Sequence, residues 1–361
     1  MIRVISGTRE ISGWDSVSLG LSLSTLCNGF QISQFPAEGL GYPLLLPGDP
    51  VKIYVDDELV IDGYVDGSAP AFSANSHTIE ISGREKTADL VDCSFEKYGT
   101  NWKNKTAAQI ISAICAAFGL SFSPNGISPG KPLPKFCAEP GSSCADMITD
   151  VCRQRDLLCA SFGTGKLMFY DDSKYGYADD ALEQGVNLIS GSASFSNEER
   201  FSLYSVLCSS EPGCKRAGSA CDPSIGRTRP LVIVEGNYGS IDSAEKRAEQ
   251  EAHIRAAKSA ECSVEVQGWR QKTGRREIWK PGLLVMTRIP AFFGNVDVEM
   301  LVNAVELGYD SSGESTSLSL VRPDFYARPT EKGTKGKKPG KKDPWDSVRR
   351  DIADYDARNG R

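Results

Sequence analysis

The 361-residue sequence has little of what most enzymes use for catalysis. It holds two histidines, His77 and His253, and neither lies in a metal-binding spacing such as His-Glu-x-x-His. A Ser-His-Asp or Cys-His arrangement therefore has few possible members. We expect both histidines to be ordinary surface or core residues. The sequence predicts no catalytic, cofactor-binding or metal-ligating residue, and hence a protein that is not an enzyme.

Long apolar runs are also missing. No stretch approaches the roughly 18 apolar residues of a membrane span. Residues 1–7 lack the sustained apolar run of a signal peptide. We therefore expect a protein that is made and folded in a cytoplasm and has no membrane insertion of its own.

Basic residues are outnumbered by acidic ones outside the C-terminal segment. The net charge is −6, but residues 331–361 carry ten Lys/Arg against six Asp/Glu, which leaves residues 1–330 at −10. Because phosphate binding needs basic surface, the acidic body argues against nucleic acid as the main partner. Residues 331–342, rich in Lys and Gly, have the composition of a linker, although their lysines could also bind phosphate. They precede a segment from Pro344 that fits a short helix, and we expect this extension to grip a partner.

One motif resembles a phosphate-binding loop, namely residues 163–166 (Gly-Thr-Gly-Lys). The full pattern needs Gly at position 160 and Ser or Thr at position 167, where Ala160 and Leu167 stand. The segment is also expected to join two strands, so no helix dipole would face a phosphate. We therefore reject a phosphate site here.

The tightest acidic group is Asp56-Asp57-Glu58, which a hairpin tip explains. A pair of carboxylates suited to glycoside hydrolysis stays open at this point, because their separation depends on the tertiary structure.

Eleven cysteines are many for a cytoplasmic protein. Four of them fall in or beside helical patterns, where a thiol behaves as a small hydrophobe: Cys115, Cys144, Cys152 and Cys159. Three more cluster in a Gly/Pro-rich segment at intervals of six and seven: Cys208, Cys214 and Cys221. This spacing suits zinc poorly. Free thiols are favoured, with a Cys214–Cys221 disulfide and a metal site as the alternatives.

The elements follow a β, α+β, β order. Residues 1–95 carry alternating strands, including 51–55, 59–61 and 77–82. Residues 96–185 hold two short helices and a hairpin. The first helix starts at the capping box Thr106–Gln109 and ends at Gly119, the second follows Ser142-Ser143, and the hairpin spans 157–170.

Residues 186–326 return to strands with one helix. Asp242–Glu245 is expected to cap a helix that ends near Lys258 and repeats alanine every four residues from 244 to 256. Strands are expected at 263–267, 283–289, 298–307 and 315–320.

An internal repeat links the two β segments. Pro47-Gly48 precedes a strand, a second strand through residues 59–65, a polar loop and an alternating strand. Pro281-Gly282 precedes the same order, through residues 300–307 and 315–320. We predict a β-rich α+β chain of two similar antiparallel β-barrel-like domains (1–95 and 186–326), separated by a small α+β insert (96–185) and followed by a basic C-terminal extension (327–361).

Residues 46–51 (LPGDPV), 62–66 (DGYVD) and 77–93 (HTIEISGREKTADLVDC) resemble the tail protein P family of Mu-like phages. Residues 106–111 and 118–120 are similar to it as well. That family belongs with the central hubs of contractile tails, which include the late control protein D type and the N-terminal part of type VI secretion spikes.

The resemblance implies a homotrimer at the centre of a tail baseplate, in a virion assembled in the host cytoplasm. Its partners would be the tail tube or tube-initiator protein and the central spike, with wedge or tape-measure proteins as further candidates. Three chains with two similar domains each would present six units to a sixfold tube and three to a spike, and an acidic lumen would suit DNA passage. The alternatives are a hub or spike that degrades peptidoglycan and a β-rich receptor- or carbohydrate-binding module.

Overall fold

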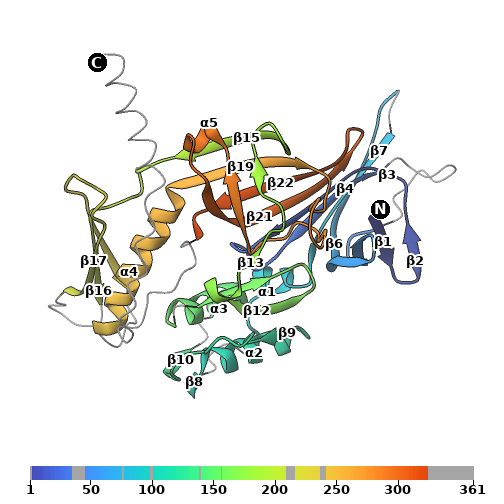
Figure 1. Cartoon of the computed structure of the whole chain (residues 1–361). Helices are drawn as coiled ribbons and strands as arrows, with labels where there is room; N and C mark the ends of the chain where they lie inside the picture. Colours follow the sequence, from blue (N-terminus) through green and yellow to red (C-terminus); the bar gives the residue numbers. More distant parts are fainter. Residues whose placement is uncertain are drawn as a thin grey trace, which may run out of the picture. The chain divides into compact units, whose positions relative to one another are not determined.

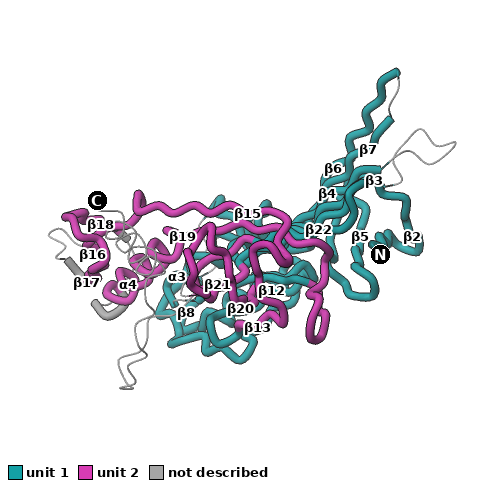
Figure 2. Tube along the Cα trace, turned by 45° about the horizontal axis from the view of Figure 1, so that its top comes forward, with its two compact units in different colours: residues 1–174, 279–281, 303–318 teal, residues 175–278, 282–302, 319–361 magenta. Residues whose placement is uncertain are grey.

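The structure is a computed structural model in which the described residues are 2–34, 45–74, 77–97, 101–137, 140–155, 157–208, 216–235 and 241–323 (Figure 1). It divides into two compact units (Figure 2). Unit 1 comprises residues 1–174, 279–281 and 303–318, and unit 2 comprises residues 175–278, 282–302 and 319–361. Strands β21 (Val298–Asp310) and β22 (Gly313–Val321) contribute residues to both units.

Unit 1 is built on an antiparallel sheet in the strand order β2-β1-β5-β6-β7-β4-β3-β21. Its strands are β1 (Ile2–Ser6), β2 (Arg9–Ile11), β3 (Trp14–Ser22), β4 (Gly29–Gln34), β5 (Pro50–Val55), β6 (Glu58–Phe72) and β7 (His77–Glu85). Apolar and polar side chains alternate along these strands, and the apolar ones define the buried face of the sheet. Val17, Leu19 and Ile32 are buried on one face, while the intervening positions are short and polar.

The same unit contains a small α+β insert with its own apolar core, defined here as the elements from α1 to β12. These are α1 (Ala88–Asp92), β8 (Asn101–Lys105), α2 (Ala107–Ala117), β9 (Ser121–Ser123), β10 (Leu133–Cys137), α3 (Cys144–Arg153), β11 (Leu158–Ser161) and β12 (Lys166–Tyr170). The capping box of Thr106 and Gln109 is present, and Ser143 caps α3 with Asp146. Both helices and the β11–β12 hairpin were predicted, and the β-rich α+β class with a small insert is confirmed.

Unit 2 combines short strands with one long helix. Its elements are β13 (Gly176–Tyr177), β14 (Leu182–Glu183), β15 (Leu188–Phe195), β16 (Leu203–Cys208), β17 (Arg216–Cys221), β18 (Pro230–Glu235), α4 (Ile241–Lys258), β19 (Ala260–Gln267), β20 (Leu283–Arg288) and α5 (Pro290–Phe293). β16 pairs with β17 antiparallel and with β18 parallel, and α4 packs against this small sheet.

The alanine stripe of α4 is largely as predicted. Ala244, Ala248 and Ala252 are buried against the small sheet, but the next buried alanine is Ala257, not Ala256. The expected start was wrong, because the helix begins at Ile241 and Asp242 already lies in its first turn. Acidic residues are stabilised in the first turn as well as at the cap, so the sequence signal could not separate the two positions.

The predicted repeat corresponds to one local geometry that occurs twice, in β5-β6-β7 and in β20-β21-β22. The Gly48 amide donates to the Val65 carbonyl and the Gly282 amide to the Val302 carbonyl, both at 2.8 Å. Both glycines have left-handed backbones, with φ of +92° and +87°, which suits glycine because it has no Cβ.

The strand register repeats as well. Val51 lies opposite Gly63, and Val285 lies opposite Met300. Each pair is three residues after its glycine and two residues before its acceptor valine, so the two hairpins agree residue for residue over this stretch. The correspondence also equates Lys52 with Met286, and both side chains are exposed.

Candidate assembly surfaces and a buried junction

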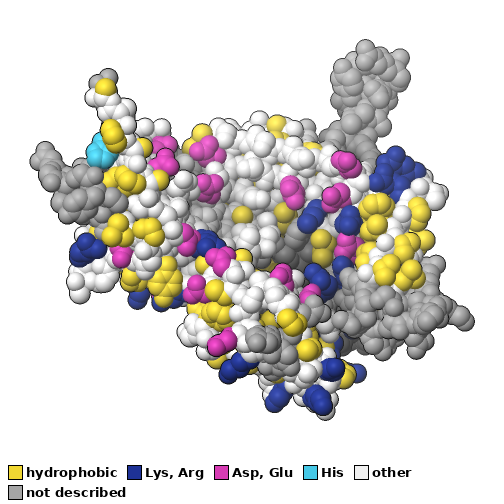
Figure 3. Space-filling view, turned by 180° about the vertical axis from the view of Figure 1, so that it is seen from behind, with side chains coloured by type: hydrophobic (Ala, Val, Ile, Leu, Met, Phe, Trp, Pro, Cys, Tyr) yellow, Lys and Arg dark blue, Asp and Glu magenta, His cyan; other side chains and the backbone are white. Residues whose placement is uncertain are grey.

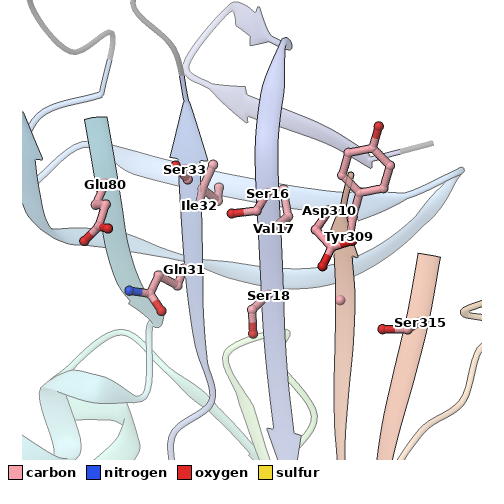
Figure 4. Close-up of a pocket in the computed structure, with 11 residues that line it drawn as sticks. Ser16, Val17, Ser18, Gln31, Ile32, Ser33, Glu80, Tyr309, Asp310 and Ser315 are labelled. Atoms are coloured by element: carbon pink, nitrogen blue, oxygen red, sulfur yellow. The ribbon is translucent and has the colours of Figure 1, made fainter. Parts of the chain in front are cut away.

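The outer face of the unit 1 sheet carries a shallow polar pocket of about 340 Å³ (Figure 4). Glu80 of β7 pairs with Ser33 of β4, and Ser33 pairs with Ser16 of β3. Asp310 continues the row, since Tyr309 beside it pairs with Val17. The row crosses four strands, and its two carboxylates stand at opposite ends.

This spacing gives no support to a two-carboxylate glycosidase at the pocket. Three inter-strand steps of about 4.8 Å place the β7 and β21 backbones about 14 Å apart. Glycoside hydrolysis needs carboxyl groups about 5–9.5 Å apart. The short polar side chains instead make a flat, hydrated surface, on which the Ser18 hydroxyl donates to Glu306 at 2.6 Å.

A second surface is the tip of the β6–β7 hairpin, which projects from the rest of the sheet (Figures 1 and 2). Phe72 is 88% exposed there, and residues 67–74 contain no charged side chain. β6 pairs with β5 only as far as Tyr64, and β7 pairs with β4 only as far as Ile79, so in the described part of the chain the tip is a two-stranded ribbon of residues 71–72 and 77–78. An exposed aromatic on an uncharged ribbon is typical of a surface that meets a partner.

A third surface is basic and lies on the insert, where Lys and Arg side chains gather at the bottom of the view in Figure 3. Lys103 of β8 lies directly opposite Lys135 of β10, and both are exposed. No carboxylate of the described residues forms an ion pair with either one. Like charges placed directly opposite each other destabilise a strand pair, so an acidic partner would relieve this arrangement.

A buried polar site of unit 1 lies at the junction between the unit 1 sheet and the insert. Glu85, the last residue of β7, is fully buried. It accepts hydrogen bonds from the Asn28 backbone and side-chain nitrogens at 2.8 Å each, from the Ser161 hydroxyl at 2.6 Å and from the Gly165 amide at 3.4 Å. Burial raises the pKa of Glu85, against the lowering effect of these donors.

The Gly163–Gly165 turn is the insert's side of this junction. The Asp62 amide donates to the Gly163 carbonyl at 2.7 Å, and Lys86 forms an ion pair with Asp62 at 2.8 Å. A Cβ on Gly163 would lie 1.9 Å from the Val60 carbonyl oxygen, and its φ is +82°. The motif that resembled a phosphate loop therefore joins β11 to β12, as predicted, and packs its backbone against β6.

The remaining residues singled out in the sequence do not converge. His77 opens β7, His253 is exposed on α4, and Asp56 lies in the β5–β6 turn. Cys221 is exposed opposite Leu203, whereas Cys214 lies outside the described residues, as does the extension 327–361.

Two absences hold for the described residues. No group of three His, Cys, Asp or Glu there is arranged to hold a metal ion. No helix in that part of the chain is long and apolar enough to span a membrane. The prediction that the chain has no catalytic, cofactor or metal residue stays a prediction.

Three family models match successive parts of this chain. Residues 1–85 match the N-terminal domain of Mu phage baseplate assembly protein GpP-like proteins, and residues 87–171 match the second domain of gp44-like baseplate hub proteins. Residues 240–328 match the fourth domain of the Mu phage baseplate assembly protein GpP. The chain is also 29% identical over 347 residues to the baseplate hub protein gp44 of Escherichia phage Mu, covering 92% of this chain and 90% of that relative.

The chain belongs to the Mu-like baseplate hub family.

Solved structures of tail proteins share the fold of this chain. The 43 kDa tail protein of prophage MuSo2 from Shewanella oneidensis is 28% identical, with a TM-score of 0.81 over 91% of this chain and 99% of that one. A tail protein from Neisseria meningitidis MC58 shares the fold at 19% identity and a TM-score of 0.74, over 89% and 96% of the two chains. An E. coli type VI secretion component, described as similar to T4 tail proteins gp27 and gp5, shares the fold at 12% identity and a TM-score of 0.56, over 91% and 79%.

The Glu85 junction was missed from the sequence, although the hub's strand pattern contained a signal for it. Ile79, Ile81 and Gly83 alternate on the buried face of β7, and Glu85 is the next residue in that register. A carboxylate at an inward position predicts a polar partner across the interface.

Proposed function

We propose that this chain is a non-enzymatic structural subunit that forms a trimeric ring at the centre of the baseplate. The ring adapts a sixfold tail tube to a threefold spike and leaves a passage for DNA. Its partners are the tube or tube-initiator protein and the central spike, with wedge or tape-measure proteins as further neighbours. We retain the division into domains 1–95, 96–185, 186–326 and 327–361 as part of this proposal.

The observation that carries the proposal is the repeated hairpin geometry. Gly48 and Gly282 donate the same hydrogen bond at the same length and start strand pairs of the same register. Three chains with two such units each offer six similar units, which a sixfold partner can contact in an equivalent way. A single unit per chain would leave half of the tube subunits without an equivalent contact.

The surfaces of unit 1 support a ring. A ring closed by rotation needs two different patches on each chain, because each copy meets the next one head to tail. The uncharged tip around Phe72 and the basic strand pair of Lys103 and Lys135 differ in chemistry and are suited to different acceptors. We propose that the Phe72 tip reaches the neighbouring copy.

The polar face of β3, β4, β7 and β21 is the surface best suited to the passage. Its pocket lining carries the carboxylates of Glu80 and Asp310 among short hydroxyl side chains, and no Lys or Arg. Negative charge discourages adhesion of a polyanion, so DNA could pass without being held. A basic lumen in the assembled ring would contradict this assignment.

Site-specific photocrosslinking tests the equivalence directly. A crosslinking amino acid is placed at Lys52 or at Met286, the matched exposed positions of β5 and β20, and at the exposed His253 of α4 as a control. In assembled tails, the two matched positions should capture the same tube-side protein and the control should not. Different partners at the two positions, or no tube-side capture from either, would contradict the proposal.

A further inference from the structure

Two cysteines face each other where the chain enters the insert. Cys93 follows α1 directly, and Cys144 is the first residue of α3. Ser94 and Ser143 form an isolated antiparallel bridge, and the Cys144 amide donates to the Cys93 carbonyl at 2.9 Å. Extended by one residue, the register of this bridge brings Cys93 and Cys144 opposite each other, with one hydrogen bond between their backbones, while the Cys93 amide donates to the Asp89 carbonyl.

The backbone at this position is spaced for a disulfide. Opposed residues in a hydrogen-bonded antiparallel pair have Cα atoms about 5.5 Å apart. Disulfides form at Cα separations of about 4.4–6.8 Å. The two segments already pair, so the backbone does not have to move for the disulfide to form.

The two thiols differ in a way that orders a reaction between them. Cys93 is exposed and Cys144 is buried, and both are free thiols. Burial, together with the neighbouring Cys93 thiol, raises the pKa of Cys144 to about 11. An external oxidant can therefore reach Cys93 first, and Cys144 is placed to resolve the product.

We propose that Cys93 and Cys144 form an intramolecular disulfide when the protein meets a small-molecule disulfide of the glutathione type. The Cys93 thiolate attacks one sulfur of the oxidant, so that a mixed disulfide forms, the oxidant's S–S bond breaks and one thiol leaves. Cys144 loses its proton to solvent and attacks the Cys93 sulfur, which releases the second thiol. Two protein thiols are oxidised and one disulfide is reduced to two thiols.

The bond would lock α3 to the segment that follows α1. It would close a loop that contains β8, α2, β9 and β10, which constrains the unfolded chain and makes the insert harder to open. The timing rests on the proposed location in a virion, because a cytoplasm keeps thiols reduced and a released particle meets oxidants. The chemistry itself needs only the isolated chain.

The test uses the purified full chain in buffers of oxidised and reduced glutathione, with peptide mapping under non-reducing conditions. We expect a Cys93–Cys144 linked peptide, loss of native alkylation at Cys93, and a rate of closure that rises with pH as Cys144 deprotonates. Cys93→Ser and Cys144→Ser should each abolish the linked peptide. Cys137→Ser, which removes an exposed thiol that lies opposite Asn101, should leave it unchanged.

Two outcomes would overturn the inference. One is a stable glutathione adduct on Cys93 with no linked peptide in the wild-type chain. The other is a link from either residue to a different cysteine, such as Cys115, whose thiol also lies near Cys144. The solution mass of the same sample separates this result from the ring proposal, since a trimer without the disulfide contradicts only the disulfide.

Discussion

At the residue scale, the buried carboxyl of Glu85 organises the contact between the first sheet and the insert. Its four donors come from two segments of unit 1 that are far apart in sequence, Asn28 and the β11–β12 hairpin, so no local pattern could have brought them together. Burying a carboxylate without hydrogen-bond partners costs several kcal/mol. With four donors, the Glu85 carboxyl instead fixes the position of the insert against the unit 1 sheet.

Glu85→Ala should lower the free energy of unfolding by about 3 kcal/mol, because it leaves buried donors of Asn28, Ser161 and Gly165 without an acceptor. Glu85→Gln keeps one acceptor oxygen and the side-chain shape, and should lose less. Urea denaturation of the two variants checks the order. Equal losses would mean that packing, not hydrogen bonding, holds the junction.

The pH dependence of the same pair tests the state of the carboxyl. Burial raises the folded-state pKa of Glu85, so its contribution to stability is present at acid pH, below the unfolded value, and is lost as the pH rises through the folded-state value. Wild type should therefore lose stability relative to Glu85→Gln as the pH is raised from about 4 towards neutrality. A wild type that gains stability relative to Glu85→Gln over this pH range would reverse the assigned direction.

Gly163→Ala should destabilise the chain by about 3 kcal/mol, because the new methyl group meets the Val60 carbonyl in a left-handed backbone. Gly185→Ala is the matched control, since Gly185 has φ +80° with nothing within 4 Å of its Cβ position. It should lose only the backbone term of about 1 kcal/mol. Thermal denaturation of both variants measures the difference. Equal effects would show that the close contact with the Val60 carbonyl does not contribute to stability.

At the element scale, the opposed lysines of β8 and β10 predict a stabilising substitution. Lys135→Glu turns a repulsion with Lys103 into an attraction and should raise the free energy of unfolding by about 0.5 kcal/mol at low salt. Lys131→Glu, which precedes β10, serves as the control for net charge. If the basic strand pair contacts a partner, the stabilised variant should assemble less well in a complementation assay.

Local signals account for the elements that the sequence predicted. The capping boxes at Thr106 and Ser143 and the glycine turn at 163–165 lie within a few residues of what they specify. The pairing of β8 with β10 joins segments far apart in sequence, and β13 and β14 are two-residue strands held by parallel pairing to β20. Such short or non-local strands have no periodicity of their own, so the sequence could not show them.

At the scale of the whole molecule, the repeat was visible in the sequence as an order of elements, and the structure adds the register. The order of elements in the sequence matched residues 59–65 with residues 300–307 as equivalent parts of the two repeats. The hydrogen bonds show instead that Val65 is equivalent to Val302. A comparison of side chains alone could not fix this offset, because the two strands carry different residues at most equivalent positions.

Phe72→Ser should weaken the association of copies by at least about 1 kcal/mol while leaving the unfolding free energy of the isolated chain unchanged, because Phe72 is 88% exposed. Val186→Ser removes another apolar side chain, 75% exposed, and is the control that should not affect association. Sedimentation over a concentration series measures both. An unchanged association in Phe72→Ser would move the interface away from the hairpin tip.

The central claim is that the working unit is a ring of three chains. The mass of the purified full chain in solution, measured by analytical ultracentrifugation alone and together with the spike protein, tests it most directly. We expect an assembly with three copies of the chain, formed either alone or when the spike is added. A stable monomer that joins no trimeric assembly under either condition would contradict it.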